Sequence, residues 1–184
     1  MLFKYLIPVL LVCIVAACGQ PVQGKNGITY KSAVQYNDYI VSRQTQLIKN
    51  VSELRQIANI NLDSAEARLN QYVAQTAGMI DEIKGMPPYK GDSSLREAAV
   101  SSFSFYKKVF EKDYMAILRL KRKADSLTEE DVNTANLIIE KIGKEEEAVD
   151  KKFHEAQKRY ASMNNMKLID NKMQKELENA GTGN

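Results

Sequence analysis

The chain has 184 residues, with 26 Lys and Arg against 23 Asp and Glu and a formal net charge of +3. This length fits a single domain, and a charge this small and evenly spread argues against nucleic-acid binding or a polybasic membrane patch. One His and two Cys leave little material for a metal site, for haem attachment or for Cys/His catalysis.

Residues 1–17 predict an export signal that is removed from the chain. Lys4 precedes a nearly continuous apolar run from Tyr5 to Val15, which is shorter than the ~20 residues that span a bilayer. The small residues Ala16 and Ala17 then stand directly before Cys18. This arrangement resembles the lipobox of bacterial lipoproteins. The alternative is an ordinary signal peptide whose small-residue cleavage site happens to lie near a cysteine.

The lipobox resemblance implies a membrane anchor at Cys18. In that family the peptide is cut just before the cysteine, which carries a diacylglyceryl group, and its new amine receives an acyl chain such as palmitate. Cys13 leaves with the signal, so we expect no disulfide, no metal and no cofactor. No Asp follows Cys18, and by resemblance to known sorting patterns this favours the outer membrane, with the periplasmic or surface face unassigned. Residues 18–28 are rich in Gly, Pro, Gln and Asn and predict a flexible tether.

Four amphipathic helical segments are expected within residues 29–165. The first carries apolar residues at helical spacing as far as Ala58, and the second, capped by Asp63 or Ser64, stops at Gly85 before two prolines. The third follows a cap at Asp92 or Ser93 and ends in a basic turn over 121–123. The fourth begins at Thr128, whose side chain is expected to cap a first turn rich in acidic residues.

Short connections between long amphipathic helices predict an all-α fold. Because such connections favour antiparallel neighbours, we expect an up-down-up-down four-helix bundle. Residues 166–178 predict a short amphipathic helix, so the chain would end in a C-terminal helical segment and frayed tail over 166–184. No strand pattern competes within the mature chain.

Polar residues interrupt the apolar faces of all four helices near one level of the bundle. The sharper hypothesis is a buried hydrogen-bonded layer of Gln44, Tyr106 and Glu146, joined by Thr76 or Asp113. Such a layer would specify helix register or line a small cavity. The alternative is that these residues drift to the edge of each apolar stripe, since a 3.6-residue helix turns ~20° per heptad against a 3.5 repeat.

The loop of Met86, Pro87, Pro88 and Tyr89 is a second candidate for function. It presents an apolar and partly rigid surface at the end of the bundle where the tether emerges. It could form a lip for a protein partner, or it could pack over the end of the core, which is the more common role for such a loop.

The sequence offers no catalytic constellation, so we expect no enzyme. A di-iron bundle needs Glu-x-x-His pairs, whereas the single histidine, His154, has Lys151 three residues earlier. His154 also lies one position beyond the apolar stripe, which favours a flanking or solvent-facing side chain over a haem ligand. No Gly-rich phosphate loop or nucleophile elbow is present.

Three motifs, taken in order, resemble a family of surface lipoproteins found widely in the Bacteroidetes. They are Tyr36-Asn37-Asp38-Tyr39-Ile40-Val41, then Lys90-Gly91-Asp92-x-x-Leu95-Arg96-x-Ala98-Ala99 with Phe105-Tyr106-Lys107, and finally Ala156-Gln157-x-x-Tyr160-Ala161. The resemblance covers roughly residues 29–168. It implies a cell-envelope location and a helical bundle, and it assigns no catalytic residue.

Two classes of function follow from these observations. The first is a lipid-anchored binding or interaction module that holds a partner protein in the cell envelope. The second is a small-ligand carrier or sensor with a pocket between helices near the polar layer. A carrier needs an internal cavity of at least a few hundred cubic ångströms, whereas an interaction module needs an exposed apolar patch.

Overall fold

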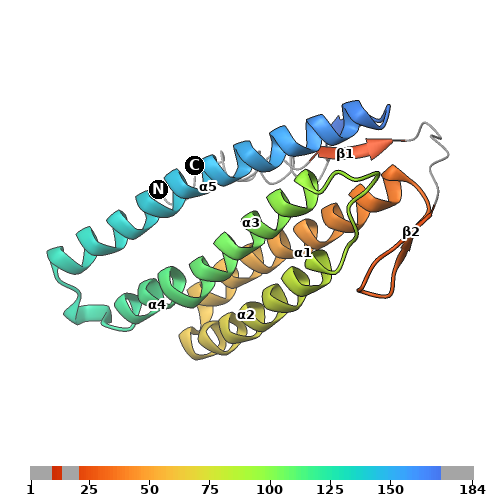
Figure 1. The fold of residues 1–184 in the computed structure, drawn as a ribbon. Helices are drawn as coiled ribbons and strands as arrows, with labels where there is room; N and C mark the ends of the chain where they lie inside the picture. The colour runs from red at the N-terminus through yellow and green to blue at the C-terminus, as the bar shows by residue number, and fades with distance from the viewer. Residues whose placement is uncertain (1–9, 14–20, 171–184) are drawn as a thin grey trace.

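The computed structural model of the chain describes residues 10–13 and 21–170. These residues form a bundle of long helices (Figure 1), which confirms the all-α class. The helical segments are α1 (Ala33–Ile60), α2 (Leu62–Lys84), α3 (Ser94–Lys108), the π-helical η1 (Val109–Tyr114), α4 (Met115–Lys121), the short 3₁₀ helix η2 (Ala124–Ser126) and α5 (Glu129–Met163). Within the bundle α2 packs against both α1 and α3, and α3 packs against α5.

The N-terminal starts of α2 and α3 are fixed by side chains that stand just before each helix. Asn61 ends α1 and caps α2, because its Oδ1 accepts a 2.8 Å hydrogen bond from the N–H of Ser64. The expectation that Asp63 or Ser64 would be this cap was therefore wrong. At α3 it is Asp92 whose Oδ1 accepts the N–H of Ser94, at 2.9 Å.

Thr128 caps α5 as its sequence predicts. The Thr128 hydroxyl accepts the N–H of Asp131 at 3.2 Å, and the Asp131 carboxylate accepts the N–H of Thr128 at 3.1 Å. The two residues thus form a reciprocal capping box, which satisfies backbone donors that the helix leaves open. This local chemistry fixes where the longest helix of the bundle begins.

The third helix expected from the sequence is interrupted by the π-helical turn η1, which lies between α3 and α4. The sequence did not predict this interruption. The apolar residues continue across it at helical spacing, so the pattern alone indicates one uninterrupted α-helix. The wider turn changes the direction of the side chains that follow. Single π-helical turns inside α-helices occur frequently at functional sites.

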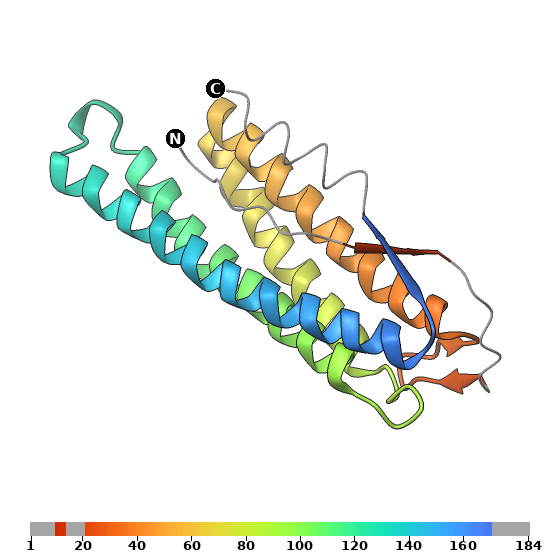
Figure 2. The ribbon, with the colours of Figure 1, turned by 90° about the horizontal axis from the view of Figure 1, so that it is seen from above.

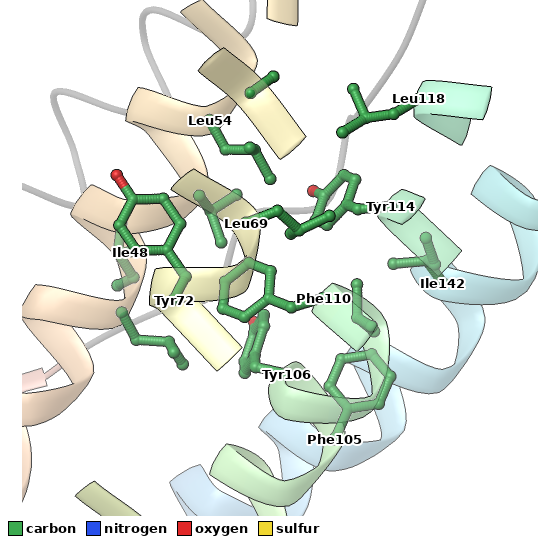
Figure 3. Packing of buried hydrophobic residues seen from close by; sticks show 14 of the residues in the cluster. Ile48, Leu54, Leu69, Tyr72, Phe105, Tyr106, Phe110, Tyr114, Leu118 and Ile142 are labelled. Carbon is green, nitrogen blue, oxygen red and sulfur yellow. The ribbon is translucent and has the colours of Figure 1, made fainter. Parts of the chain in front are cut away.

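Two groups of buried side chains fill the bundle. The distal core lies toward the α1–α2 and α4–α5 connections and includes Leu47, Leu54, Leu69, Phe110, Leu118 and Ile142 (Figure 3). The proximal core lies at the opposite end and includes Tyr30, Tyr36, Ile83, Tyr89, Phe103 and Tyr160. The proximal core is rich in tyrosine rings that contact one another, such as Tyr36 and Tyr160, whose centroids are 5.6 Å apart.

Residues before α1 form a small hairpin on the proximal end of the bundle. Strand β2 (Val22–Gln23) pairs with β3 (Thr29–Tyr30), and the side-chain amide of Asn26 donates to the Tyr30 hydroxyl at 2.7 Å and to the Glu82 carbonyl at 3.1 Å. The flexible tether expected over 18–28 is therefore wrong for residues 21–28. Their Gly and Asn residues make a turn, in which Gly27 has a φ of +78°.

The chain after α5 is extended rather than helical. Strand β4 (Lys167–Asp170) pairs antiparallel with β1 (Leu10–Cys13), with Leu10 opposite Asp170. The C-terminal helix expected from residue 166 is thus wrong for Lys167–Asp170, and its remainder lies outside the described residues. Strand β1 lies beside α1 (Figure 2). It belongs to the segment that lipobox cleavage would remove, so maturation would take this partner from β4.

Candidate functional site

The structure buries the polar residues of the predicted layer, and within the described part of the chain it joins two of them by a hydrogen bond. The Tyr106 hydroxyl on α3 donates a 2.7 Å hydrogen bond to Oε1 of Glu146 on α5, and both residues are buried. Gln44 is 1 % exposed, yet neither of its amide atoms has a hydrogen-bond partner within the described part of the chain. Gln44 is therefore a buried member of the site that does not take part in its hydrogen bonding.

Thr76 and Asp113 are buried as well, but their interactions lie outside this layer. The Thr76 hydroxyl donates to the carbonyl of Tyr72 on its own helix at 2.7 Å. The Lys141 ammonium forms an ion pair with Oδ1 of Asp113 at 2.7 Å, which joins η1 to the outer side of α5. The structure leaves the Tyr106–Glu146 pair as the hydrogen-bonded part of the layer that the sequence predicted.

Asp150 is a buried acid that the sequence analysis missed. It lies one helical turn after Glu146 on the buried side of α5 and is 7 % exposed. Burial raises the pKa of Glu146 to about 7, and burial together with the charge of Glu146 raises the pKa of Asp150 to about 9. The i, i+4 spacing of the two acids was the available signal. We call Glu146 and Asp150 the buried acid pair.

Arg55 and Tyr114 adjoin the buried acid pair and were also missed. Arg55 is half-buried on α1, hydrogen bonds with the Tyr114 hydroxyl, and its charge lowers the pKa of Glu146. Tyr114 is the last residue of η1, and burial raises its pKa to about 12. Residues from α1, η1 and α5 thus meet at this point, although they are far apart in the sequence.

A pocket of about 570 Å³ opens to solvent between α1, α4 and α5 at the distal end of the bundle. We call it the distal pocket. Its walls are mainly apolar, and they include Leu54, Ala58, Ile117, Leu118, Val132 and Ile139. Arg55 and Tyr114 line it as well, so the pocket borders groups that interact electrostatically with Glu146.

The distal pocket exists because α5 diverges from α1 along the bundle. At the proximal end the Gln157 amide donates to Oδ1 of Asn37 at 3.0 Å, and the Tyr160 hydroxyl donates to the Ala33 carbonyl at 3.2 Å. Figures 1 and 2 show the two helices moving apart toward the other end. The first turns of α5 consequently leave Val132 45 % exposed, although its place on the stripe predicts burial.

The Pro-Pro loop packs over the proximal end of the core. Met86 and Tyr89 are each 1 % exposed, and the Tyr36 hydroxyl donates to the Pro87 carbonyl at 2.9 Å. Pro88 is exposed. The interpretation of this loop as a cover for the core accounts for these contacts.

Among residues 10–13 and 21–170 there is no group of three metal-binding side chains. No helix in the same ranges is long and apolar enough to cross a membrane. Comparison of the chain with protein-family models, with curated proteins and with solved structures finds no match. The resemblance to surface lipoproteins stays a prediction from its motifs, and function has to be argued from the site itself.

Proposed function

We propose that this protein is a lipid-anchored helical bundle of the bacterial cell envelope that binds a small, largely apolar ligand in the distal pocket. The observation that carries the proposal is the pocket itself, at about 570 Å³ with mainly apolar walls. Ligand pockets typically measure roughly 300–1,000 Å³ and combine apolar lining with a few polar groups. Arg55 and Tyr114 are such polar groups, and they border the buried acid pair.

The anchor is supported by the sequence around Cys18, which lies outside the described residues. It is tested by growing cells with an alkyne analogue of palmitate and measuring label on the protein. We expect labelling of the unchanged chain and of Cys13→Ser, which alters the cysteine that leaves with the signal. Cys18→Ser should lose the label. Labelling of Cys18→Ser at the level of the unchanged chain would contradict the anchor.

The pocket is tested by native mass spectrometry of the protein purified from cells. We expect a co-purifying small molecule in the unchanged protein, and its loss in Ala135→Trp, because Ala135 lines the pocket and the indole would fill it. Ala148→Trp is the matched control, since Ala148 is exposed on the same helix. Equal ligand retention by the two variants would refute the pocket as binding site.

A second candidate is docking of a partner protein at the same place. It is favoured by Leu127 and Val132, which line the pocket and are 42 % and 45 % exposed. A photo-crosslinking residue at position 127 would capture such a partner in intact cells. Capture that persists in Ala135→Trp would favour the partner over the small ligand, because a docking surface tolerates a filled pocket better than a binding cavity does.

A further inference from the structure

We infer that the ligand of the distal pocket is a single-chain amphiphile with an anionic head, such as a long-chain carboxylate. This inference rests on the proposed function and names the class of ligand. It combines the apolar walls of the pocket, the charges placed beside them, and the distance of the pocket from the anchored end of the chain.

The walls of the pocket suit an alkyl chain. Side chains from three helices contribute aliphatic groups, among them Leu54 from α1, Leu118 from α4 and Ile139 from α5. A polar ligand would lose its hydration there without gaining hydrogen bonds in return. An alkyl chain instead gains about fourfold in affinity for each methylene group that it buries.

The charges beside these walls favour a negative head group. Arg55 and Lys121 both line the pocket. The Lys121 ammonium donates to the Ala58 carbonyl at 3.1 Å and to Oδ1 of Asn59 at 2.9 Å, and among the described residues it has no carboxylate within ion-pair distance. The one acid of the lining, Asp131, is neutralised by Lys123 at 2.6 Å.

The carboxyl beside Arg55, that of Glu146, is partly protonated near neutral pH. Burial holds the pKa of Glu146 at about 7, so roughly half of this carboxyl is protonated at that pH. The guanidinium of Arg55 also presents a planar fork of donors that matches a carboxylate or a phosphate. A ligand that lies in the pocket with its head toward Arg55 would therefore meet complementary charge.

The position of the pocket favours a free amphiphile over a lipid of the anchoring bilayer. The β2–β3 hairpin joins the N-terminal end of α1, while the pocket lies at the C-terminal end of this 28-residue helix, which is about 42 Å long. Figure 1 shows the hairpin and the α4–α5 turn at opposite ends of the bundle. Residues 18–20 extend about 10 Å at most, so an acyl chain on Cys18 starts far from the pocket.

The inference is tested by calorimetric titration of the purified full chain with dodecanoate, dodecanol and dodecyltrimethylammonium as monomers. We expect dodecanoate to bind at least tenfold more tightly than dodecanol, and the cation to bind most weakly. Decanoate should bind about 15-fold more weakly than dodecanoate, because it has two fewer methylene groups. Vesicles of phosphatidylglycerol form a separate arm, and binding to these vesicles without binding of monomeric dodecanoate would overturn the inference.

Variants separate the head group from the chain. Arg55→Gln and Lys121→Gln should each weaken the binding of dodecanoate at least fivefold and leave the affinity for dodecanol unchanged. Lys121→Gln keeps the test valid if Arg55→Gln unfolds. Ala135→Trp should abolish the binding of both compounds, whereas Ala148→Trp should not alter the affinity for either compound. Equal affinities for dodecanoate and dodecanol, both lost in Ala135→Trp, would overturn the inference that the ligand has an anionic head. The pocket would still be the binding site. No binding of any amphiphile would overturn the inference, and the co-purification experiment would then decide the proposed function separately.

Discussion

The hydroxyl of Tyr106 donates a 2.7 Å hydrogen bond to Oε1 of Glu146 across the interface between α3 and α5. The other carboxylate oxygen of Glu146 and Oδ1 of Asp150 have no hydrogen-bond partner within the described part of the chain. A buried carboxyl with this little solvation is more stable protonated than charged. The stability of the bundle should therefore depend on pH through this interface.

Glu146 is expected to make the folded protein less stable as the pH rises from about 4.5 to about 7. The folded state binds its proton up to a pKa of about 7, against an ordinary value of 4.5, so its stabilising effect is complete below pH 4.5 and is lost above pH 7. The shift corresponds to about 3 kcal/mol. The surrounding charged and titratable groups are Arg55 from α1, Tyr106 from α3, Tyr114 from η1 and Asp150 from α5.

The substitution Glu146→Gln tests this dependence because it keeps an oxygen for the Tyr106 hydroxyl and removes the titration. We expect its free energy of unfolding in denaturant to fall less than that of the unchanged protein between pH 5 and pH 8. Glu147→Gln, at the exposed neighbouring position, should follow the unchanged protein. If all three proteins showed the same slope, Glu146 would not be titrating in this range.

Gln44→Leu should stabilise the protein. The change removes a buried amide that has no hydrogen-bond partner in the described residues and replaces it with an apolar side chain of similar size. We expect a gain of about 1–3 kcal/mol in the free energy of unfolding, measured by denaturant titration. Gln56→Leu on the exposed side of α1 is the control and should change stability by under about 0.5 kcal/mol. A loss of stability in Gln44→Leu would show that the amide is satisfied in solution.

Two glycine substitutions should act in opposite directions. Gly91 has a φ of +83° in the turn between α2 and α3, and alanine there is expected to cost about 1–2 kcal/mol. Gly78 is exposed inside α2 with no atom within 4 Å of an added Cβ, so alanine should add about 0.8–1 kcal/mol. Thermal unfolding of both variants checks the pair. A stabilised Gly91→Ala would contradict the left-handed turn.

Loss of the α5 cap is expected to weaken the distal end of the bundle. Thr128→Ala removes the hydroxyl that accepts the N–H of Asp131, at a cost of about 1 kcal/mol. Hydrogen exchange should show faster opening in the first turns of α5 than in its last turns. Thr134→Ala, at an exposed position inside the same helix, should be neutral or slightly stabilising. The same exchange rates in both variants would argue against the capping box.

The sequence predicts the features of the fold that depend on residues close together in the chain, but some helix caps and turns remain ambiguous. Thr128 was identified as a cap because its partner Asp131 lies within one turn. The cap at Asn61 could not be distinguished from Asp63 or Ser64, because three polar residues within four positions offer equivalent caps. The Gly and Asn residues within 21–28 suit both tethers and turns, and contacts with α2 distinguish these two states.

The sequence by itself determined the all-α class, because helical spacing of apolar residues is repeated along each segment and is independent of what the segment packs against. The tertiary structure decided which polar residues meet. Arg55 interacts electrostatically with Glu146, and Gln44 has no hydrogen-bond partner among the described residues, because of the distances between helices, which no local pattern records. It also decided the distal pocket, since the exposure of Val132 follows from the divergence of α5 from α1 and not from its own stripe.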